Sequence, residues 1–319
     1  MPANRISLQI TAAAFFVLST VLTAACGGSS TVNVVARPNV APSPVQDCRG
    51  ATETDPGYSA SPGVTFHTLQ VDGKLRDYRL LRPSTVDFSK PVPLVIVLHG
   101  SPADAQSFED LIHFDNEAIA GKFMTAGPNG CSGYWSYAER GPYQADEDFI
   151  RQMINDLEAR YPVDRSRIYV VGASAGTWVA YRLACDMADE IAAIASVAGT
   201  MRLSDACQPG KPVSILEMHG TLDSVHPWQG GGPHLAFGVE EVIHRWVALD
   251  GCPAGPVSAH AGITTTSLWR HCAGGVDVRL DSVVGGLHQW FGSDFSPVPG
   301  EPNANEAIWN FFRSVPPRT

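Results

Sequence analysis

A serine between small residues stands in the middle of the sequence, in Gly172-Ala-Ser-Ala-Gly176. A five-residue pattern with three fixed positions also arises by chance, so its surroundings decide its meaning. Residues 168–171 before it are typical of a buried strand, and residues 178–183 after it have apolar side chains at helical spacing. A serine in such a strand-to-helix turn has an exposed hydroxyl that can attack a carbonyl carbon. We therefore predict Ser174 as a nucleophile, with the backbone N–H of Ala175 as a donor to the developing oxyanion.

A serine hydroxyl needs a general base, and the base needs an orienting carboxylate. Around an elbow of this kind, the acid and then the histidine follow the serine along the chain. Asp223 follows a predicted strand at 213–218, and His288 follows a predicted strand at 276–284, next to two glycines. We predict Asp223 as the acid and His288 as the base. The fallback carboxylates are Asp186, Asp189 and Asp205.

The other histidines have simpler explanations. His99 and His219 each precede a glycine at the end of a predicted strand, so we expect them to shape loops. His226 lies in a loop rich in Gly and Pro, at the surface or at the mouth of a site. His219, Asp223 and His226 also suggest a metal cluster, but the spacing lacks the H-x-x-x-H pattern of a helical metal site. We predict no metal and no cofactor.

A second oxyanion donor is expected in the loop after the apolar run 94–98, which reads His99-Gly-Ser-Pro102. Proline has no backbone N–H, so Pro102 cannot donate. The sequence therefore favours the backbone N–H of Ser101 as the second donor.

Aromatic side chains gather near the predicted strand ends, where they can bind flat acyl groups, sugars or polyester chains alike. Trp178 lies on the helix after the nucleophile and is as well suited to the core. Tyr134 and Tyr137 flank one of the tryptophans in a Gly-rich loop. The predicted substrate-binding residues are Trp290, Trp228, Trp135 and Trp178.

Strand and helix patterns alternate along the chain from residue 64 onward. A pair of strands, 64–69 and 77–81, is joined by a turn at Asp72-Gly73. The further predicted strands are 94–98, 123–126, 168–171, 191–197, 213–218 and 276–284. The predicted helices are 105–120, 147–160, 178–183, 239–249 and 306–312. Alternation of this kind predicts an α/β fold with a mostly parallel sheet, whose chemistry lies beyond the carboxyl ends of the strands.

The N-terminus has the pattern of an export signal. Arg5 supplies a positive charge, residues 10–22 are largely apolar, and small residues precede Cys26. The apolar run is too short for a comfortable membrane span. Cys26 and the following Gly-Gly-Ser-Ser resemble a bacterial lipobox with a flexible tether, except that Thr23 stands where an aliphatic residue is usual.

We accordingly predict three segments: a signal peptide at 1–25, a Pro/Ser/Gly-rich tether at 26–62 and a catalytic domain at 63–319. Cys26 is the predicted lipid anchor to a membrane, so the protein is expected at the cell envelope. Free secretion after ordinary cleavage of the signal peptide is the alternative.

Six cysteines remain after Cys26, and an even number in an exported chain predicts disulfides. None lies in a C-x-x-C pair, so a structural zinc site is not expected. Separation along the chain suggests the pairs Cys185–Cys207 and Cys252–Cys272, which leaves Cys48 and Cys131.

The formal net charge is −10, with 22 Lys and Arg against 32 Asp and Glu. Such a chain has no basic footprint for nucleic acid. We attribute the acidity to solubility, and we expect a monomer.

Several motifs together resemble the secreted polyhydroxybutyrate depolymerase / feruloyl esterase family of α/β-hydrolases, which has bacterial lipoprotein members. The resemblance runs in consistent order from Val64 to Phe312. It is carried by Leu98-His99-Gly100, 146–150, 163–165, Ser174-Ala175-Gly176, 180–185, 193–199, His219-Gly-Thr-Leu-Asp223 and Gly285-Gly-Leu-His-Gln-Trp290. The resemblance implies an α/β-hydrolase fold and an ester substrate, with Ser174, Asp223 and His288 as the catalytic residues.

Two positions depart from the family pattern. Members usually have Cys after His-Gly and Gly after Ser-Ala-Gly, where this chain has Ser101 and Thr177. The first change affects a disulfide or a loop contact, and the second affects the pocket wall or the packing of the helix. The substrate is therefore less firmly implied than the mechanism.

Two other functions fit the sequence less well than an ester hydrolase does. A serine peptidase of related fold normally needs an added gating domain, for which this chain has no room. A non-catalytic surface binding protein would have no reason to keep Ser174, Asp223 and His288 together.

Overall fold

The computed structural model describes residues 46–50, 61–136, 144–205, 207–232, 235–294, 296 and 298–318. By its internal contacts the chain divides into two units, Met1–Pro42 and Ser43–Thr319. The expected signal peptide, the lipid anchor Cys26 and most of the expected tether lie outside the described residues. All that follows concerns the second unit.

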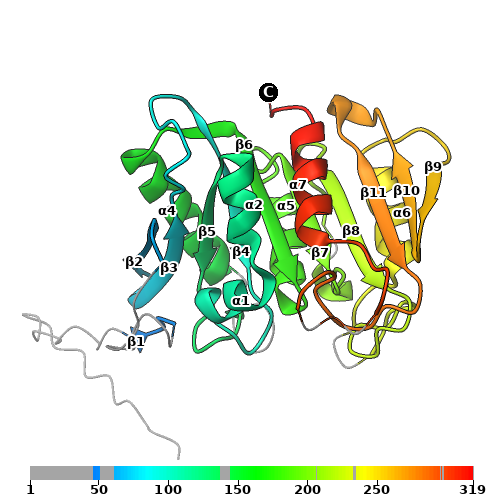
Figure 1. Cartoon of the computed structure of the whole chain (residues 1–319), viewed down its shortest axis with the longest axis horizontal. Coiled ribbons are helices and arrows are strands. Elements are labelled where there is room, and N and C mark those ends of the chain that lie inside the picture. Colours follow the sequence, from blue (N-terminus) through cyan, green and yellow to red (C-terminus); the bar gives the residue numbers. More distant parts are fainter. Residues whose placement is uncertain are drawn as a thin grey trace, which may run out of the picture. The chain divides into compact units, whose positions relative to one another are not determined.

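Within the described residues, eleven strands form one sheet in the order β1-β3-β5-β4-β6-β7-β8-β11-β10-β9, with β2 paired to β3 (Figure 1). The strands are β1 (Gln46–Asp47), β2 (Val64–Val71), β3 (Lys74–Leu81), β4 (Val92–Leu98), β5 (Met124–Pro128), β6 (Val163–Ala173), β7 (Ala193–Val197), β8 (Ser214–Gly220), β9 (Val257–Ala261), β10 (Thr264–Trp269) and β11 (Val278–Val283).

The centre of the sheet is parallel and its edges are antiparallel. Strands β5, β4, β6, β7, β8 and β11 run in one direction. At one edge β3 runs against β5, and at the other β10 runs against β11. Both β4 and β8 are buried along their whole length, as expected for strands covered by helices on both faces.

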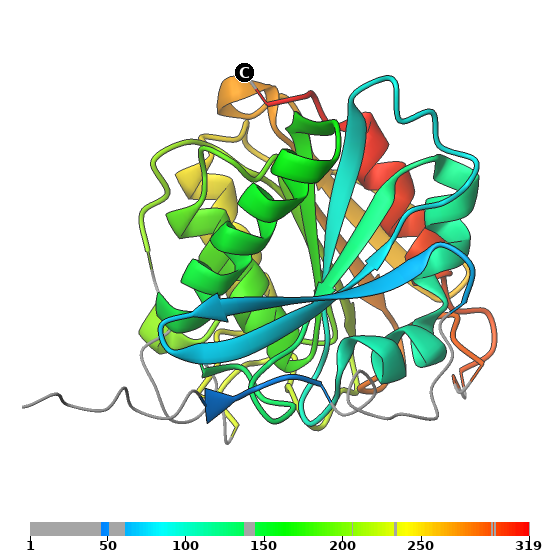
Figure 2. The same ribbon diagram turned by 90° about the vertical axis from the view of Figure 1, so that its left-hand side faces the viewer.

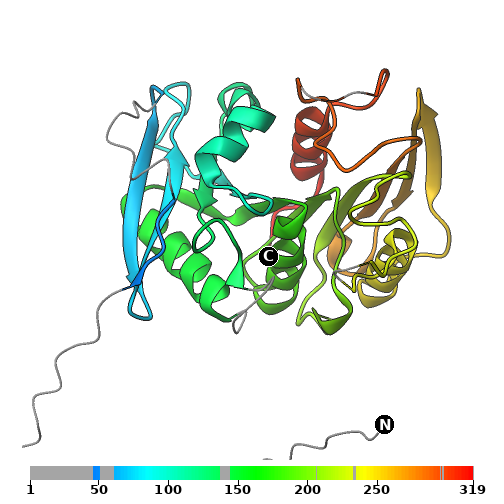
Figure 3. The ribbon, with the colours of Figure 1, turned by 90° about the horizontal axis from the view of Figure 1, so that it is seen from below.

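Helices cover the two faces of the sheet in two layers, which Figures 2 and 3 show from the side and from below. Helices α4 (Gln144–Arg160), α5 (Ala175–Asp186) and α6 (Val239–Leu249) pack on one face. Helices α1 (Ala105–Ile112), α2 (Phe114–Gly121) and α7 (Ala304–Ser314) pack on the other. Alternate side chains of β4 enter the two cores, because successive strand residues point to opposite faces.

The helix predicted at 105–120 is two helices, so that prediction is wrong. The chain turns at His113, whose φ of 52° ends α1 in the left-handed region while its N–H bonds the carbonyl of Glu109. Because non-glycine residues rarely adopt this conformation, composition gave no signal for the break.

Strands β9 and β10 were not predicted. All five residues of β9 are exposed, so the strand has no buried face and no apolar alternation to announce it. Strand β10 is polar over most of its length and was missed for the same reason. The short strand β1, which pairs with β3, falls in the segment expected to be a tether.

Three disulfides brace the described fold, and they join the pairs that sequence separation suggested. Cys185 at the end of α5 binds Cys207, and Cys252 after α6 binds Cys272 before β11. The remaining pair, Cys48–Cys131, ties the chain after β1 to the loop after β5. Among the described helices, none combines the length and apolar character that crossing a membrane would require.

Candidate active site

Ser174 lies at the junction between β6 and α5, in the backbone conformation of a sharp elbow. Its φ is 51° and its ψ is −120°, a strained combination for a residue with a side chain. Its N–H donates to the carbonyl of Val197 at 3.0 Å. A Cβ atom on Gly172 would overlap the carbonyl of Gly176, and one on Gly176 would overlap the carbonyl of Leu98. Only glycine at these two positions allows β4, the elbow and the helix to approach so closely.

The structure brings Ser174, His288 and Asp223 into one hydrogen-bonded chain. The Nε2 atom of His288 lies 3.0 Å from the hydroxyl oxygen of Ser174, and its Nδ1 lies 2.8 Å from Oδ2 of Asp223. The three side chains come from the loops after β6, β8 and β11. These strands are parallel, so their carboxyl ends meet at one edge of the sheet.

The carboxylate of Asp223 is buried and fully engaged. Besides the bond to His288, its Oδ1 accepts from the backbone N–H groups of Val225 and His226, both at 2.8 Å. Burial by itself raises the pKa of Asp223, but the hydrogen bonds from His288 and His226 and the nearby imidazoles outweigh it and lower the pKa. The acid is therefore held in its ionised form.

A cavity of about 260 Å³ opens beside the hydroxyl of Ser174. Its walls are mainly apolar, and Trp290 meets Phe108 edge to face at a centroid distance of 5.7 Å. The indole N–H of Trp290 donates to Asn305, which fixes the ring. The cavity is lined by Gly100, Ser101, Pro102, Ala103, Phe108, Leu111, Ala173, Ser174, Ala198, His288, Gln289 and Trp290.

Of the four predicted substrate-binding tryptophans, Trp290 alone lines this cavity. Trp135 is buried, stacks on His99 at 4.6 Å and donates to its carbonyl. Trp178 packs in the core beneath α5, and Trp228 packs on its edge. None of these three rings lines the cavity beside Ser174, because proximity to a strand end in the sequence does not tell which way a ring points. Tyr137 lies outside the described residues.

The predicted oxyanion donors flank the serine. A Cβ atom on Gly100 would lie 3.3 Å from the Cβ of Ser174, so the loop after β4 lies directly against the nucleophile. Ser101 lines the cavity next to it. Ala175 is the first residue of α5, and the first N–H groups of a helix have no partner within it.

The loop after β4 is held by His99. Its Nε2 accepts from the N–H of Gly130 at 2.9 Å, so its Nδ1 carries the proton and donates to the carbonyl of Gly100. Burial lowers the pKa of His99 to about 4, although the bond to Gly100 opposes this. The imidazole is neutral at pH 7.

Thr177 departs from the family pattern without reaching the cavity. Its hydroxyl donates to the carbonyl of Ser174 at 2.6 Å, and the side chain is fully buried. A Cβ atom on Gly199 would overlap this hydroxyl, so the two positions are matched in size. The change therefore affects helix packing and leaves the pocket wall unaltered.

Sequence reasoning missed several residues of the site. Phe108 and Leu111 come from α1 and line the cavity. Glu217, two residues before His219 on β8, is fully buried. A single acidic residue in an otherwise apolar strand was the signal that could have revealed Glu217.

No family model matches the sequence. A protein of Nocardia uniformis subsp. tsuyamanensis named as the esterase NocK is 28% identical over 319 residues, covering 90% of this chain and 91% of that protein. A protein of Aspergillus niger named as feruloyl esterase C is 28% identical over 272 residues, covering 82% of this chain and 91% of that protein. Among solved structures, a CE1 ferulic acid esterase from Anaeromyces mucronatus has a TM-score of 0.51 at 15% identity, covering 83% of this chain and 94% of that one.

The chain has the α/β-hydrolase fold, and its sequence is similar to proteins named as an esterase and as feruloyl esterases. The predicted resemblance and the predicted fold class are both confirmed. The similar proteins are named as esterases, which supports a carboxylic ester hydrolase.

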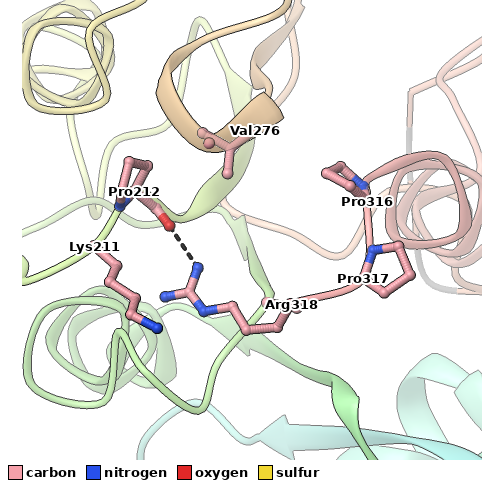
Figure 4. A pocket seen from close by; sticks show the side chains of 8 residues that line it. Lys211, Pro212, Val276, Pro316, Pro317 and Arg318 are labelled. Carbon is pink, nitrogen blue, oxygen red and sulfur yellow. Dashed lines mark hydrogen bonds between the residues drawn. The ribbon is translucent and has the colours of Figure 1, made fainter.

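A second cavity of this α/β-hydrolase, about 150 Å³ in volume, lies away from Ser174 (Figure 4). It is lined by residues that directly precede β7, β8 and β11 and by residues that follow α7. It therefore lies at the amino ends of these strands, whereas Ser174 lies at the carboxyl ends. Arg318 lines it and donates to the carbonyl of Pro212 at 2.6 Å. Among the described residues, no group of three His, Cys, Asp or Glu side chains is placed to hold a metal ion.

Proposed function

We propose that the chain hydrolyses its esters through an acyl-enzyme, with Ser174 as nucleophile, His288 as general base and Asp223 as orienting acid. The observation that carries the proposal is the continuous chain of contacts, 3.0 Å from Ser174 to His288 and 2.8 Å from His288 to Asp223. Both lie within the range over which a proton passes between donor and acceptor.

In the first half-reaction the oxygen of Ser174 attacks the ester carbonyl carbon, and its proton passes to Nε2 of His288. The tetrahedral oxyanion is stabilised by the backbone N–H groups of Ser101 and Ala175. When the carbon–oxygen bond of the ester breaks, the alcohol leaves with the proton from His288. Water then attacks the acyl-serine in the same way, which releases the carboxylic acid and restores the free serine.

We further propose short or aromatic acyl groups as substrates, with feruloyl-type esters foremost and hydroxyalkanoate oligomers or acetyl esters as further candidates. The apolar cavity with the ring of Trp290 suits a flat acyl group. The names of the relatives point in the same direction.

The test is a hydrolysis panel with wild-type protein: p-nitrophenyl esters from acetate to laurate, methyl ferulate, acetylated xylan and hydroxybutyrate oligomers. We expect turnover of methyl ferulate or the short esters. Ser174→Ala and His288→Ala should each lower kcat by about 10³-fold or more, with the fold retained by circular dichroism.

Preference for the longest acyl chains would contradict the proposed substrate class. A wild-type protein that hydrolyses no ester and is not labelled by a fluorophosphonate would overturn the mechanism as well.

The three disulfides fit an oxidising compartment and hence export. We propose that Cys26 carries a lipid anchor after removal of residues 1–25, and that 26–62 serves as the tether. Every residue of the proposed machinery comes from one chain, so a monomer suffices. Cys26→Ser should move the protein from the membrane fraction to soluble export. Unchanged fractionation would favour free secretion.

A further inference from the structure

Behind the acid lies a second carboxylate–histidine pair, Glu217 and His219, at the end of β8. Both side chains have no exposed surface. The Nδ1 atom of His219 lies 3.0 Å from Oε1 of Glu217, and its Nε2 lies 2.8 Å from the carbonyl oxygen of His226. The other oxygen of Glu217 accepts from the hydroxyl of Tyr181 on α5 at 2.8 Å.

The contacts of His219 favour its doubly protonated form. A backbone carbonyl can only accept, so Nε2 donates to His226. The Nδ1 atom lies 3.0 Å from Oε1 of Glu217, and the pair shares one proton. Burial raises the pKa of Glu217, and the hydrogen bonds from His219 and Tyr181 oppose that rise. We place the shared proton on Nδ1 of His219, because the carboxylate also accepts from Tyr181. An imidazole that donates from both nitrogens is an imidazolium. Burial alone would lower the pKa of His219, but the hydrogen bond and the negative charge of Glu217 outweigh it and raise the pKa.

His219 also contacts Asp223 directly. The Nε2 atom of His219 lies 3.5 Å from Oδ2 of Asp223, the same oxygen that receives the N–H of His288. A buried positive charge at this distance favours the ionised form of the acid. Asp223 therefore has a cation on each side whenever His288 takes up a proton.

The Glu217–His219 pair is also connected to His288, through the turn at residues 223–226. Because His219 holds the carbonyl of His226, it fixes the turn whose N–H groups donate to Oδ1 of Asp223. The ring of His226 stacks on the ring of His288 at 5.4 Å, with 16° between the planes. On its other side it contacts Trp178 at 5.5 Å. The imidazole of His288 is thus backed by a ring that His219 holds in place.

We propose that Glu217 and His219 are positioning residues: a buried ion pair that holds the acid loop and the base in register with Ser174. The inference rests on the proposed function, because it concerns the same three side chains. The titratable side chains in contact with His219 are Glu217 and Asp223. Tyr181 contacts Glu217, and His288 contacts Asp223 and the ring of His226.

Glu217→Gln removes the negative charge but keeps an amide that can hydrogen-bond both His219 and Tyr181. His219 then loses the proton on Nδ1, and the positive charge beside Asp223 disappears. We expect kcat to fall by about 10-fold or more with KM unchanged, because the pair does not line the cavity. We also expect the acid limb of the pH profile of kcat/KM to move to higher pH by about half a unit, since a site without that charge takes up an inactivating proton more readily.

The matched control is Asp281→Asn on the neighbouring strand β11. Asp281 is also buried, and its partners are Arg279 and Thr266. We expect this variant to lose stability while kcat, KM and the pH profile stay as in wild type. A purely structural role for Glu217 predicts the same behaviour for Glu217→Gln, and that outcome in a folded variant would overturn the proposal.

A measurement on the wild-type protein guards against a variant that does not fold. With ¹⁵N-labelled histidine, the resonances lost in His219→Gln should report an imidazole protonated on both nitrogens at pH 7.5. A neutral His219 would overturn the proposal whatever the variants do. Wild-type protein without esterase activity would refute the proposed function instead, so the two failures are distinguishable.

Discussion

Two histidines with no exposed surface lie next to the loops that follow β4 and β8, and they differ in charge. His99 follows β4 and lies behind the oxyanion loop, whereas His219 ends β8 and lies behind the acid. Burial lowers the pKa of both imidazoles. It prevails at His99, whose pKa is about 4, and it is overcome at His219, whose pKa is raised.

The difference comes from the partners of the two rings. His99 meets one donor, the N–H of Gly130, and one acceptor, the carbonyl of Gly100, which together fit a neutral ring. His219 meets two acceptors, and one of them is the carboxylate of Glu217. A buried imidazole thus takes the charge that its hydrogen-bond partners require.

The two loops also have different tasks. The loop after β4 serves the proposed reaction through a backbone N–H, which needs a fixed chain path and no charge. The loop after β8 presents a carboxylate that must stay ionised in a buried place. A neutral histidine suits the first task, and a cationic histidine with its own counter-ion suits the second.

The pH dependence of the unfolding free energy is the strongest test of this difference between His99 and His219. The unfolded chain takes up a proton at the ordinary histidine pKa of about 6.5, whereas folded His99 takes it up only near 4. The stability contributed by neutral His99 is therefore complete above pH 6.5 and is lost as the pH falls from 6.5 to 4. The full loss corresponds to about 3 kcal/mol. His219 has the opposite sign, because its raised pKa contributes stability below pH 6.5 that is lost as the pH rises.

The measurement is urea unfolding between pH 4 and pH 8 for wild type and His99→Gln. Glutamine can still donate and accept a hydrogen bond but cannot take up a proton. The difference in unfolding free energy between the two proteins should shrink as the pH falls. His260→Gln, on the exposed strand β9, is the control. A difference that stays constant with pH would mean that His99 is not held neutral.

Much of the fold followed from pattern alone. The strands β4, β6 and β8 were predictable because a strand buried on both faces has a continuous apolar run. Helix α6 was predictable because a helix buried on one face has apolar residues at helical spacing. The break at His113 and the exposed strand β9 were not, since neither depends on a buried apolar pattern. Strand β9 is defined by its pairing with the next strand, β10, which local composition does not indicate.

The candidate site shows the same division. The order of Ser174, Asp223 and His288 along the chain, with their places after predicted strands, led to the prediction of a triad. In the structure the three side chains form one hydrogen-bonded chain. The direction of a tryptophan ring was not readable, so Trp135, Trp178 and Trp228 were predicted to bind substrate, whereas in the structure they do not line the cavity beside Ser174. The role inferred for Glu217 required the distance to His219, which no spacing rule contains.

The smallest expected effect concerns Ser101, at the oxyanion loop. If this loop acts through its backbone, the side chain of Ser101 contributes nothing to catalysis. Its hydroxyl oxygen is buried and has no hydrogen-bond partner within the described part of the chain. Ser101→Ala removes that hydroxyl and keeps the N–H, so kcat/KM should stay within about 3-fold of wild type, equivalent to less than about 1 kcal/mol. The unfolding free energy should be unchanged or slightly higher, because an unsatisfied buried hydroxyl is lost. A fall in kcat/KM of more than about 10-fold would show that the hydroxyl itself contacts the reacting ester, and the contrast between a backbone loop and a side-chain loop would fail.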